Sequence, residues 1–134
     1  MVTIFGIKHC DTVKKALKWL ERENVTHQFH DFRKDGLDED LVDHFLTGLG
    51  YSSLINTRGT TWRKLFNEQK ADLNAAKARN LMLTNDAIIK RPVWLFEDGA
   101  MRIGFSKKEQ DSIAEKLQVK SLTGVSVAEF IEQK

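Results

Sequence analysis

The first 32 residues constrain the fold of this chain more than any other stretch. Residues 2–5 form a short apolar run that Gly6 breaks, and a helical pattern follows over about residues 11–24. A second strand candidate, residues 26–32, comes directly after that helix. Two strands joined through one helix are typical of a βαβ unit, whose strands pair in parallel. The opening of the chain therefore predicts a parallel pair of strands.

The helix of this unit has one apolar face. Its apolar residues recur at the i, i+3, i+4 and i+7 spacing of an amphipathic helix, while lysines and an arginine occupy other positions. The apolar face consists of Val13, Ala16, Leu17 and Leu20. Asp11 or Thr12 is suited to cap the helix start, since both side chains accept hydrogen bonds from first-turn N–H groups.

The middle of the chain, residues 37–84, is predicted to be helical. A first helix begins with an acidic turn at Asp38, and a short helix capped by Thr60 or Thr61 includes Trp62, Leu65 and Phe66. Asp72 is expected to open a further helix that is rich in alanine and leucine. No strand pattern interrupts this region, so we expect a helical insert between two β-containing halves.

A β pattern returns after the insert. Residues 93–96 form a continuous apolar run, typical of a strand that is covered on both faces, and Glu97-Asp98-Gly99 is a hairpin-turn signal. Residues 101–105 complete the hairpin, and Ser106 caps another helix. This order predicts a four-stranded mixed α/β sheet flanked by helices. A two-layer α+β fold without a parallel pair is the alternative.

We expect one domain over residues 1–134. Residues 1–36 and 85–118 make its core, residues 37–84 the insert, and residues 119–134 a C-terminal tail with a short amphipathic stretch over residues 127–131. A formal net charge of +2 gives no general attraction to nucleic acid or to a membrane, and no apolar run reaches about 18 residues. The lone cysteine excludes an internal disulfide. These features predict a cytoplasmic monomer without a nucleic-acid or membrane partner.

Cys10 is the strongest candidate for chemistry. It lies where the turn after Gly6 meets the helix, beside Lys8 and His9. The free N–H groups and the positive dipole end of a helix start both favour the reactive thiolate. His9 either changes the reactivity of the thiol through its proximity or points outward. The alternative for Cys10 is that it serves only as a small buried apolar residue. Val13 stands where a Cys-x-x-Cys motif has its second cysteine, so a redox cycle needs an outside thiol, most simply glutathione.

Two arginines are candidates for binding an anion. Arg58 lies in Asn56-Thr57-Arg58-Gly59-Thr60, where a helix start offers backbone donors and the guanidinium adds a bidentate fork. A solvated basic loop is the alternative there. Arg91 precedes Pro92, the only proline, which opens a buried strand, and it would lie at the end of the sheet, where ligands of α/β folds collect. The alternative for Arg91 and Pro92 is that they only mark the start of the strand and bind no ligand.

The histidines do not indicate a metal centre. His27 and His30 are three residues apart, and on a strand this spacing puts their side chains on opposite faces. We therefore expect neither a metal site nor a bound cofactor.

Taken together, the motifs resemble the arsenate reductase (ArsC/Spx) family. The resemblance extends from residue 2 to about residue 117 and rests on Gly6-x-x-x-Cys10 with Lys14-Lys15-Ala16, Asn56-Thr57-Arg58-Gly59-Thr60 and Lys90-Arg91-Pro92. Longer matches resemble the YffB-type branch of this family, namely Cys10-Asp11-Thr12-Val13-Lys14-Lys15-Ala16, Asp35-Gly36-Leu37, Asn56-Thr57-Arg58-Gly59-Thr60-Thr61-Trp62-Arg63-Lys64 and Ala87-Ile88-Ile89-Lys90-Arg91-Pro92.

The resemblance implies a thioredoxin-like fold with an inserted helical subdomain and a cis-proline at Pro92. In the glutathione-coupled arsenate reductases, one cysteine attacks the oxyanion, and arginines bind the oxyanion and stabilise the thiolate. These roles map onto Cys10, Arg58 and Arg91. Two family features are missing: Ile103-Gly104-Phe105-Ser106 holds no third arginine, and Gly6 replaces the histidine four residues before the cysteine.

The YffB-type resemblance implies a glutathione-dependent thiol reductase that forms a mixed disulfide on Cys10. We expect Arg58, Arg91, Thr12 and Lys8 to bind glutathione or another anion, and Gly6 and Pro92 to shape the site. Glutathione would be a co-substrate, with glutaredoxin as a further partner. One alternative is a true arsenate reductase coupled to glutathione and glutaredoxin. Another is a non-catalytic regulator that binds RNA polymerase, as Spx-type regulators do, although these commonly carry Cys-x-x-Cys.

Overall fold

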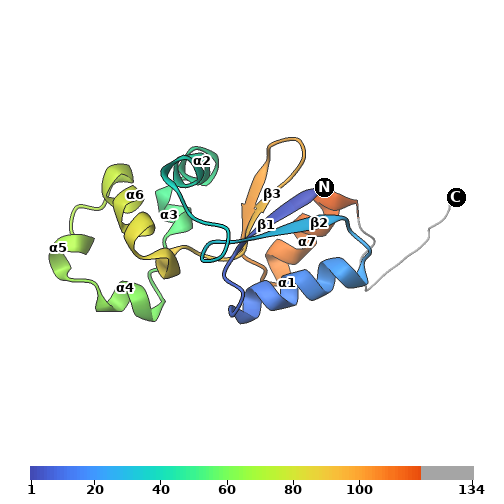
Figure 1. Cartoon of the computed structure of the whole chain (residues 1–134), viewed down its shortest axis with the longest axis horizontal. Helices are drawn as coiled ribbons and strands as arrows, with labels where there is room; N and C mark the ends of the chain where they lie inside the picture. The colour runs from blue at the N-terminus through green and yellow to red at the C-terminus, as the bar shows by residue number, and fades with distance from the viewer. Residues whose placement is uncertain (119–134) are drawn as a thin grey trace, which may run out of the picture.

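The computed structural model describes residues 1–118, and Figure 1 shows a sheet with helices on both faces and a group of helices beyond one end. In chain order the elements are β1 (Val2–Gly6), α1 (Asp11–Arg22), β2 (His27–Asp31), α2 (Glu39–Leu49), α3 (Tyr51–Leu54), α4 (Thr60–Lys64), α5 (Asn67–Lys70), α6 (Ala75–Thr84), the 3₁₀ helix η1 (Asp86–Ile88), β3 (Val93–Leu95), β4 (Met101–Ile103) and α7 (Lys107–Leu117). This order confirms the predicted mixed α/β fold.

The sheet has the strand order β2-β1-β3-β4. Strands β1 and β2 are parallel, with Ile4 opposite Phe29, as the βαβ pattern predicts. Strand β3 is antiparallel to both β1 and β4, and its Trp94 lies opposite Ile4 on one side and Arg102 on the other. The parallel pair rules out the α+β alternative. The antiparallel pairing of β1 with β3 brings the end of β1 to the start of β3.

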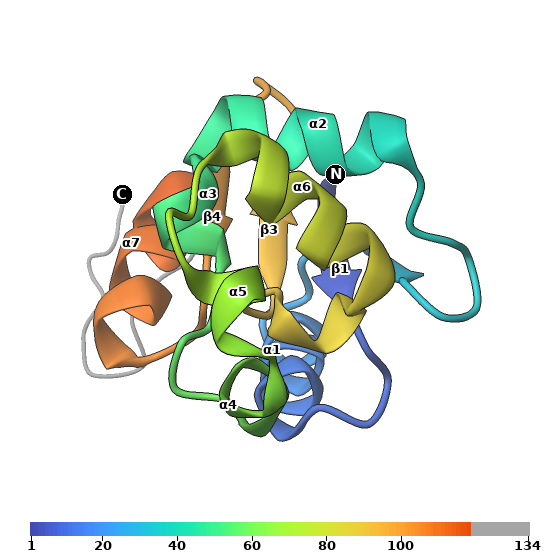
Figure 2. The ribbon, with the colours of Figure 1, turned by 90° about the vertical axis from the view of Figure 1, so that its left-hand side faces the viewer.

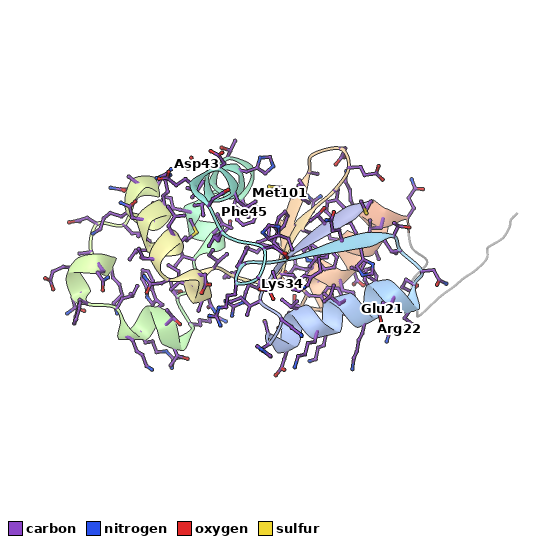
Figure 3. The ribbon with its side chains drawn as sticks, viewed as in Figure 1. Glu21, Arg22, Lys34, Asp43, Phe45 and Met101 are labelled. Carbon is purple, nitrogen blue, oxygen red and sulfur yellow. The ribbon has the colours of Figure 1, made fainter. Side chains whose placement is uncertain are left out.

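Two hydrophobic cores lie on opposite faces of the sheet because side chains alternate along each strand. On one face, Ile4 and Trp94 pack with residues of α1 and α7. On the other face, Phe5 packs with helices α2, α3 and α6. Figure 3 shows Phe45 of α2 and Met101 of β4 close together in this second core. Each large side chain that is fully buried in this way contributes about 1.5–3 kcal/mol.

The predicted helical insert returns to the sheet through η1. Ile55, after α3, forms an antiparallel bridge with Ile89, and the Lys90 N–H donates to the Leu54 carbonyl at 2.7 Å. The Arg91–Pro92 peptide bond, which follows directly after this segment, is cis, as the resemblance implied. These contacts fix the segment that carries Arg91 against the end of α3.

The structure corrects the predicted starts of two insert helices. Helix α4 begins after Gly59 rather than at a threonine cap, and it ends before Leu65 and Phe66, of which Phe66 is 73% exposed. Helix α6 begins after Asn74, whose side chain accepts from the Lys77 N–H at 2.9 Å. Asp72 has a φ of 51° and so belongs to a turn, not to a helix start.

Strand β4 is shorter than predicted. It ends at Ile103 because Gly104 has a φ of +89°, a left-handed conformation that turns the chain toward α7. Ser106 precedes α7 as predicted, and its N–H donates to Glu109 at 2.9 Å. The expected amphipathic stretch over residues 127–131 lies outside the described residues.

No helix within residues 1–118 has the length and apolarity needed to cross a membrane. No group of three or more histidine, cysteine, aspartate or glutamate side chains in this part of the chain is arranged to hold a metal ion.

Candidate active site

Cys10 lies at the junction between β1 and α1. Its N–H donates to the Ile7 carbonyl at 3.0 Å, and its own carbonyl accepts the first helical hydrogen bond, from the Lys14 N–H at 3.0 Å. The backbone of Cys10 is extended, with φ −77° and ψ 124°, so the residue is the N-cap of α1. A half-buried thiol therefore faces the first turn of a helix, as the sequence predicted.

The surroundings of Cys10 lower the pKa of its thiol below the ordinary value. Burial raises the pKa, but three groups together outweigh it: the backbone N–H of Val13, the side chain of Arg91 and the backbone N–H of Thr12. Thr12 and Val13 are the second and third residues of the helix, whose N–H groups have no partner within the helix. The helix start and one arginine thus favour the thiolate.

Arg91 is held beside Cys10 by the backbone of η1. Its Nη1 donates to the Ala87 carbonyl at 3.1 Å, while its Nε is buried and has no acceptor within residues 1–118. A buried donor without a partner is destabilising by about 1–3 kcal/mol. A bound anion is the kind of acceptor that a guanidinium prefers. Arg91 therefore combines support for the thiolate with unused capacity for an anion.

Arg58 is not brought into contact with the thiol. It is exposed on the loop between α3 and α4, and it is not among the groups that shift the pKa of Cys10. Its N–H donates to the Asn56 side chain at 3.1 Å, and its carbonyl accepts from Arg63 Nη2 at 2.7 Å. The backbone of this loop is well fixed, while the guanidinium is left on the surface of the insert.

The 3₁₀ helix η1 anchors both arginine-bearing segments. Its Ala87 carbonyl accepts from Arg91, and its Ile88 carbonyl accepts from the Asn56 N–H at 2.7 Å. Asn56 in turn holds the backbone of Arg58. The two arginines therefore come from loops that share one rigid support, although only one of them reaches Cys10.

The remaining predicted site residues fall into two groups. Thr12 is half-buried and acts on the thiol through its backbone N–H, whereas Lys8 and His9 are exposed. Gly6 and Pro92 lie at the ends of β1 and β3 that approach Cys10. What each of these residues binds stays a prediction, because the structure gives their positions only.

The two departures from the family pattern have visible structural counterparts. A Cβ at Gly6 would lie 2.7 Å from Cγ2 of Val13, so any side chain at this position requires Val13 or the backbone around it to shift. A histidine is therefore incompatible with the present position of Val13 against β1. Arg102, the nearest arginine to the place of the missing third one, lies within β4 and donates to the Met101 carbonyl at 2.9 Å.

The sequence predicts that free N–H groups of a helix start act on Cys10, and the structure identifies them as those of Thr12 and Val13. This agrees with the rule that an N-cap side chain faces the second and third helical N–H groups. The group that sequence reasoning missed is the Ala87 carbonyl, which holds Arg91. It had no comparable signal, because a short 3₁₀ turn leaves little trace in sequence.

Known proteins resemble this chain in sequence over most of its described length. Residues 5–113 match the family model described as the ArsC family. An uncharacterized protein of Haemophilus influenzae is 46% identical over 109 residues, which cover 81% of this chain and 95% of that protein. The global transcriptional regulator Spx of Streptococcus mutans is 31% identical over 111 residues, 81% of this chain and 80% of the regulator.

Solved structures of similar proteins share the fold of this chain. A YffB protein superposes with a TM-score of 0.77 at 39% identity, covering 84% of this chain and 97% of its own. The solution structure of an arsenate reductase (ArsC) related protein from Brucella melitensis superposes with a TM-score of 0.70 at 43% identity, covering 83% and 92%. The match over most of the chain, in both sequence and fold, places this protein in the ArsC family, with the thioredoxin-like architecture of its structural neighbours.

Proposed function

We propose that this protein is a glutathione-dependent thiol reductase that uses Cys10 as its only nucleophile. One observation carries the proposal: Cys10 caps α1 beside Arg91, and the pKa of its thiol lies below the ordinary value. Thiolate is the form that attacks a disulfide. A family whose members include arsenate reductase-related proteins is consistent with an oxidoreductase.

The reaction takes place in two exchange steps that need no second cysteine. The Cys10 thiolate attacks the glutathione sulfur of a mixed disulfide, the S–S bond breaks, and the substrate leaves as a thiolate that takes a proton from water. A second glutathione, as thiolate, attacks the glutathione sulfur now bound to Cys10. Oxidised glutathione leaves, and the Cys10 thiolate is restored. Glutathione thus supplies the electrons that reduce the substrate disulfide to a thiol.

Arg91 has the clearest role in this scheme. Its charge supports the thiolate, and its buried Nε is available to a glutathione carboxylate. We assign Arg58, Lys8 and Thr12 to binding the rest of the tripeptide, with Arg58 contributing from the insert. Glutathione is a co-substrate here, and no resident cofactor is required. The protein would act in the cytoplasm, because this compartment keeps glutathione in its thiol form. We propose that it does so as a monomer.

Mass spectrometry after exposure to oxidised glutathione tests the proposal. We expect one glutathione adduct on the wild type and none on Cys10→Ser. Reduced glutathione should then remove the adduct, and the wild type should reduce the mixed disulfide of glutathione and 2-mercaptoethanol. A Cys10 that stays unmodified and titrates at or above the ordinary thiol value of about 8.5 would contradict the proposal.

Arsenate reduction is the narrower enzymatic alternative. The unpartnered Nε of Arg91 beside a thiol suits a tetrahedral oxyanion as well as a carboxylate. The absence of an arginine in Ile103-Gly104-Phe105-Ser106 argues against it. An assay with arsenate, glutathione and glutaredoxin separates the two functions, because an arsenate reductase forms arsenite whereas a thiol reductase of other substrates does not.

A regulatory role is supported by a different observation, the 31% identity to the Streptococcus mutans regulator Spx. A role like that of the Spx-type regulators would imply that this protein binds RNA polymerase without catalysis. Val13 occupies the second position of their usual Cys-x-x-Cys motif, which weakens this candidate. A pull-down with purified RNA polymerase decides the question: stoichiometric recovery, together with no turnover of the mixed disulfide, would favour the regulator.

A further inference from the structure

Four exposed lysines, at the start of α1 and just before it, form a group of cations without an acidic partner within residues 1–118. Arg33 pairs with Asp86, Arg79 with Asp43 and Glu39, and Lys116 with Asp98. Within residues 1–118, Lys14, Lys15 and Lys18 are exposed and form no ion pair. Exposed Lys8, two residues before the cysteine, is likewise unpaired in that range. We call Lys8, Lys14, Lys15 and Lys18 the basic face.

The basic face lies next to the reactive thiol. Along a helix the rise is about 1.5 Å per residue, so Lys14 and Lys18 are about 6 and about 12 Å from Cys10 along the axis. Both distances are close to the screening length of about 8 Å at physiological salt. A ligand docked on the thiol would therefore interact electrostatically with these lysines.

A second group of cations lies across from α1. Arg58, Arg63 and Lys64 are exposed at the start and the end of α4. Figures 1 and 2 both place α4 on the same lower side of the molecule as the start of α1. A substrate that reaches Cys10 from this side thus approaches between two positively charged flanks.

One group of four carboxylates lies on another part of the surface. Asp38, Glu39, Asp40 and Asp43 are exposed at the start of α2. Helix α2 lies on the upper side in Figure 1, and Figure 3 shows Asp43 on its outer surface. Residues 8–18 contain four lysines and one acidic residue, Asp11, so the surroundings of Cys10 are locally basic although the whole chain has a net charge of only +2.

We propose that the preferred substrates of Cys10 are polypeptides whose disulfide-bonded cysteine is flanked by carboxylates, which dock on the basic face. The inference rests on the proposed function and names its substrate class. A polypeptide fits better than a nucleic acid, because the cations surround a thiol whose reaction requires a sulfur partner. The chemistry is the exchange already described: Cys10 takes the glutathione from the substrate cysteine, and a second glutathione regenerates the thiolate.

Paired peptides test this preference in a kinetic assay. Each peptide carries one glutathionylated cysteine, flanked by four aspartates in one and by four lysines in the other. At low salt the wild type should reduce the aspartate peptide roughly tenfold faster in kcat/KM, and added salt should remove the difference. Lys14→Glu with Lys15→Glu should abolish or invert the preference. Equal rates for both peptides at low salt would overturn the proposal.

Two controls make the kinetic result specific. Arg22→Glu changes one charge on the same helix about 18 Å from Cys10 along the axis, so the peptide preference should change less than twofold. Rates are normalised to the mixed disulfide of glutathione and 2-mercaptoethanol, because a nearby glutamate also makes Cys10 less reactive toward every substrate. The single variant Lys15→Glu is the matched comparison, since it also changes one charge. If Arg22→Glu alters the peptide preference as much as Lys15→Glu does, the proposal that charges near the thiol set the preference is refuted.

A binding experiment separates this proposal from the proposed function. The full-length Cys10→Ser protein is titrated with serine versions of the two peptides and observed by NMR. We expect shifts at the amides of residues 8–18 with the aspartate peptide and none with the lysine peptide, whether or not the wild type reduces any disulfide. Tighter binding of a single-stranded oligonucleotide of equal charge would overturn the docking proposal. Failure of the wild type on the small mixed disulfide would overturn the proposed function alone.

Discussion

The Ala87 carbonyl accepts a hydrogen bond from Arg91 Nη1 at 3.1 Å, so a backbone dipole rather than a carboxylate orients the arginine beside Cys10. Within residues 1–118 Arg91 takes part in no ion pair. A carboxylate partner would neutralise much of the field at the thiol, whereas a carbonyl holds the side chain and leaves its charge available. The same charge can therefore act on the thiolate and on a bound anion.

Replacing Arg91 should raise the pKa of Cys10, because the arginine is one of the groups that lower it. The lost interactions with charged groups are worth about 1.5–3 kcal/mol, so kcat/KM for the mixed disulfide should fall roughly 10- to 150-fold in Arg91→Ala. The rate of alkylation as a function of pH gives the pKa. Arg91→Lys serves as the matched control, since it keeps the charge but lacks the bidentate fork.

The outcome of the lysine control discriminates between two roles of Arg91. A purely electrostatic role predicts a thiol pKa near that of the wild type in Arg91→Lys. A positioning role that depends on the bond to Ala87 predicts a pKa closer to that of Arg91→Ala. A titration of Cys10 in Arg91→Ala that matches the wild type would contradict the assignment of Arg91 altogether.

Arg58→Ala should leave the alkylation profile of Cys10 unchanged, because Arg58 is not among the groups that shift its pKa. If Arg58 binds glutathione from the insert, KM for glutathione should rise while the reactivity of the thiol stays constant. We expect a rise of roughly 1.5- to 5-fold, as for the loss of one exposed charged contact. A raised pKa of Cys10 in this variant would show that Arg58 reaches the thiol after all.

The fold was predictable from local patterns to an unusual extent. The apolar run before Gly6, the helical spacing after Cys10 and the hairpin signal before Met101 each mark an element that the structure contains. The starts of insert helices were less predictable. Threonines are good caps in isolation, but Gly59 holds the cap position of α4 because the loop before it is fixed by Asn56.

The candidate site was predictable only in part. Cys10 could be identified because its chemistry depends on a helix start, which is a local feature. The different placements of Arg58 and Arg91 depend on how the insert folds back through η1, and this long-range arrangement has no local signal. Sequence reasoning therefore identified both arginines as candidates. It could not distinguish Arg91, which lowers the pKa of the Cys10 thiol, from Arg58, which does not.

The lowered pKa of Cys10 makes the stability of the fold depend on pH. Because the folded-state pKa lies below the unfolded one, ionisation of Cys10 favours the folded state. The contribution is fully present above the unfolded pKa and is lost as the pH falls through the folded pKa. The difference in free energy of unfolding between the wild type and Cys10→Ser should therefore rise with pH across this interval and be flat on either side of it.

Urea denaturation at several pH values measures this difference, with Cys10→Ser as the reference because it shares every other titrating group. The activity toward the mixed disulfide should rise over the same interval as the folded-state thiolate forms. The two curves need not coincide, since activity follows only the folded pKa whereas stability depends on both. A stability difference that decreases with rising pH would contradict a lowered pKa.

Gly6→Ala should destabilise the protein by about 1–3 kcal/mol, because its Cβ would lie 2.7 Å from Cγ2 of Val13 and overpack the contact between β1 and α1. Val13→Ala alone should also destabilise, by about 1–2.5 kcal/mol, through the loss of buried methyl groups. The double variant should be more stable than the sum of the two single effects indicates, since removing the methyls of Val13 makes room for the new Cβ. Urea denaturation of all four proteins gives this coupling energy. Additive effects would mean that the crowding at Gly6 is relieved elsewhere, and that packing against α1 does not explain why glycine stands where the family pattern has histidine.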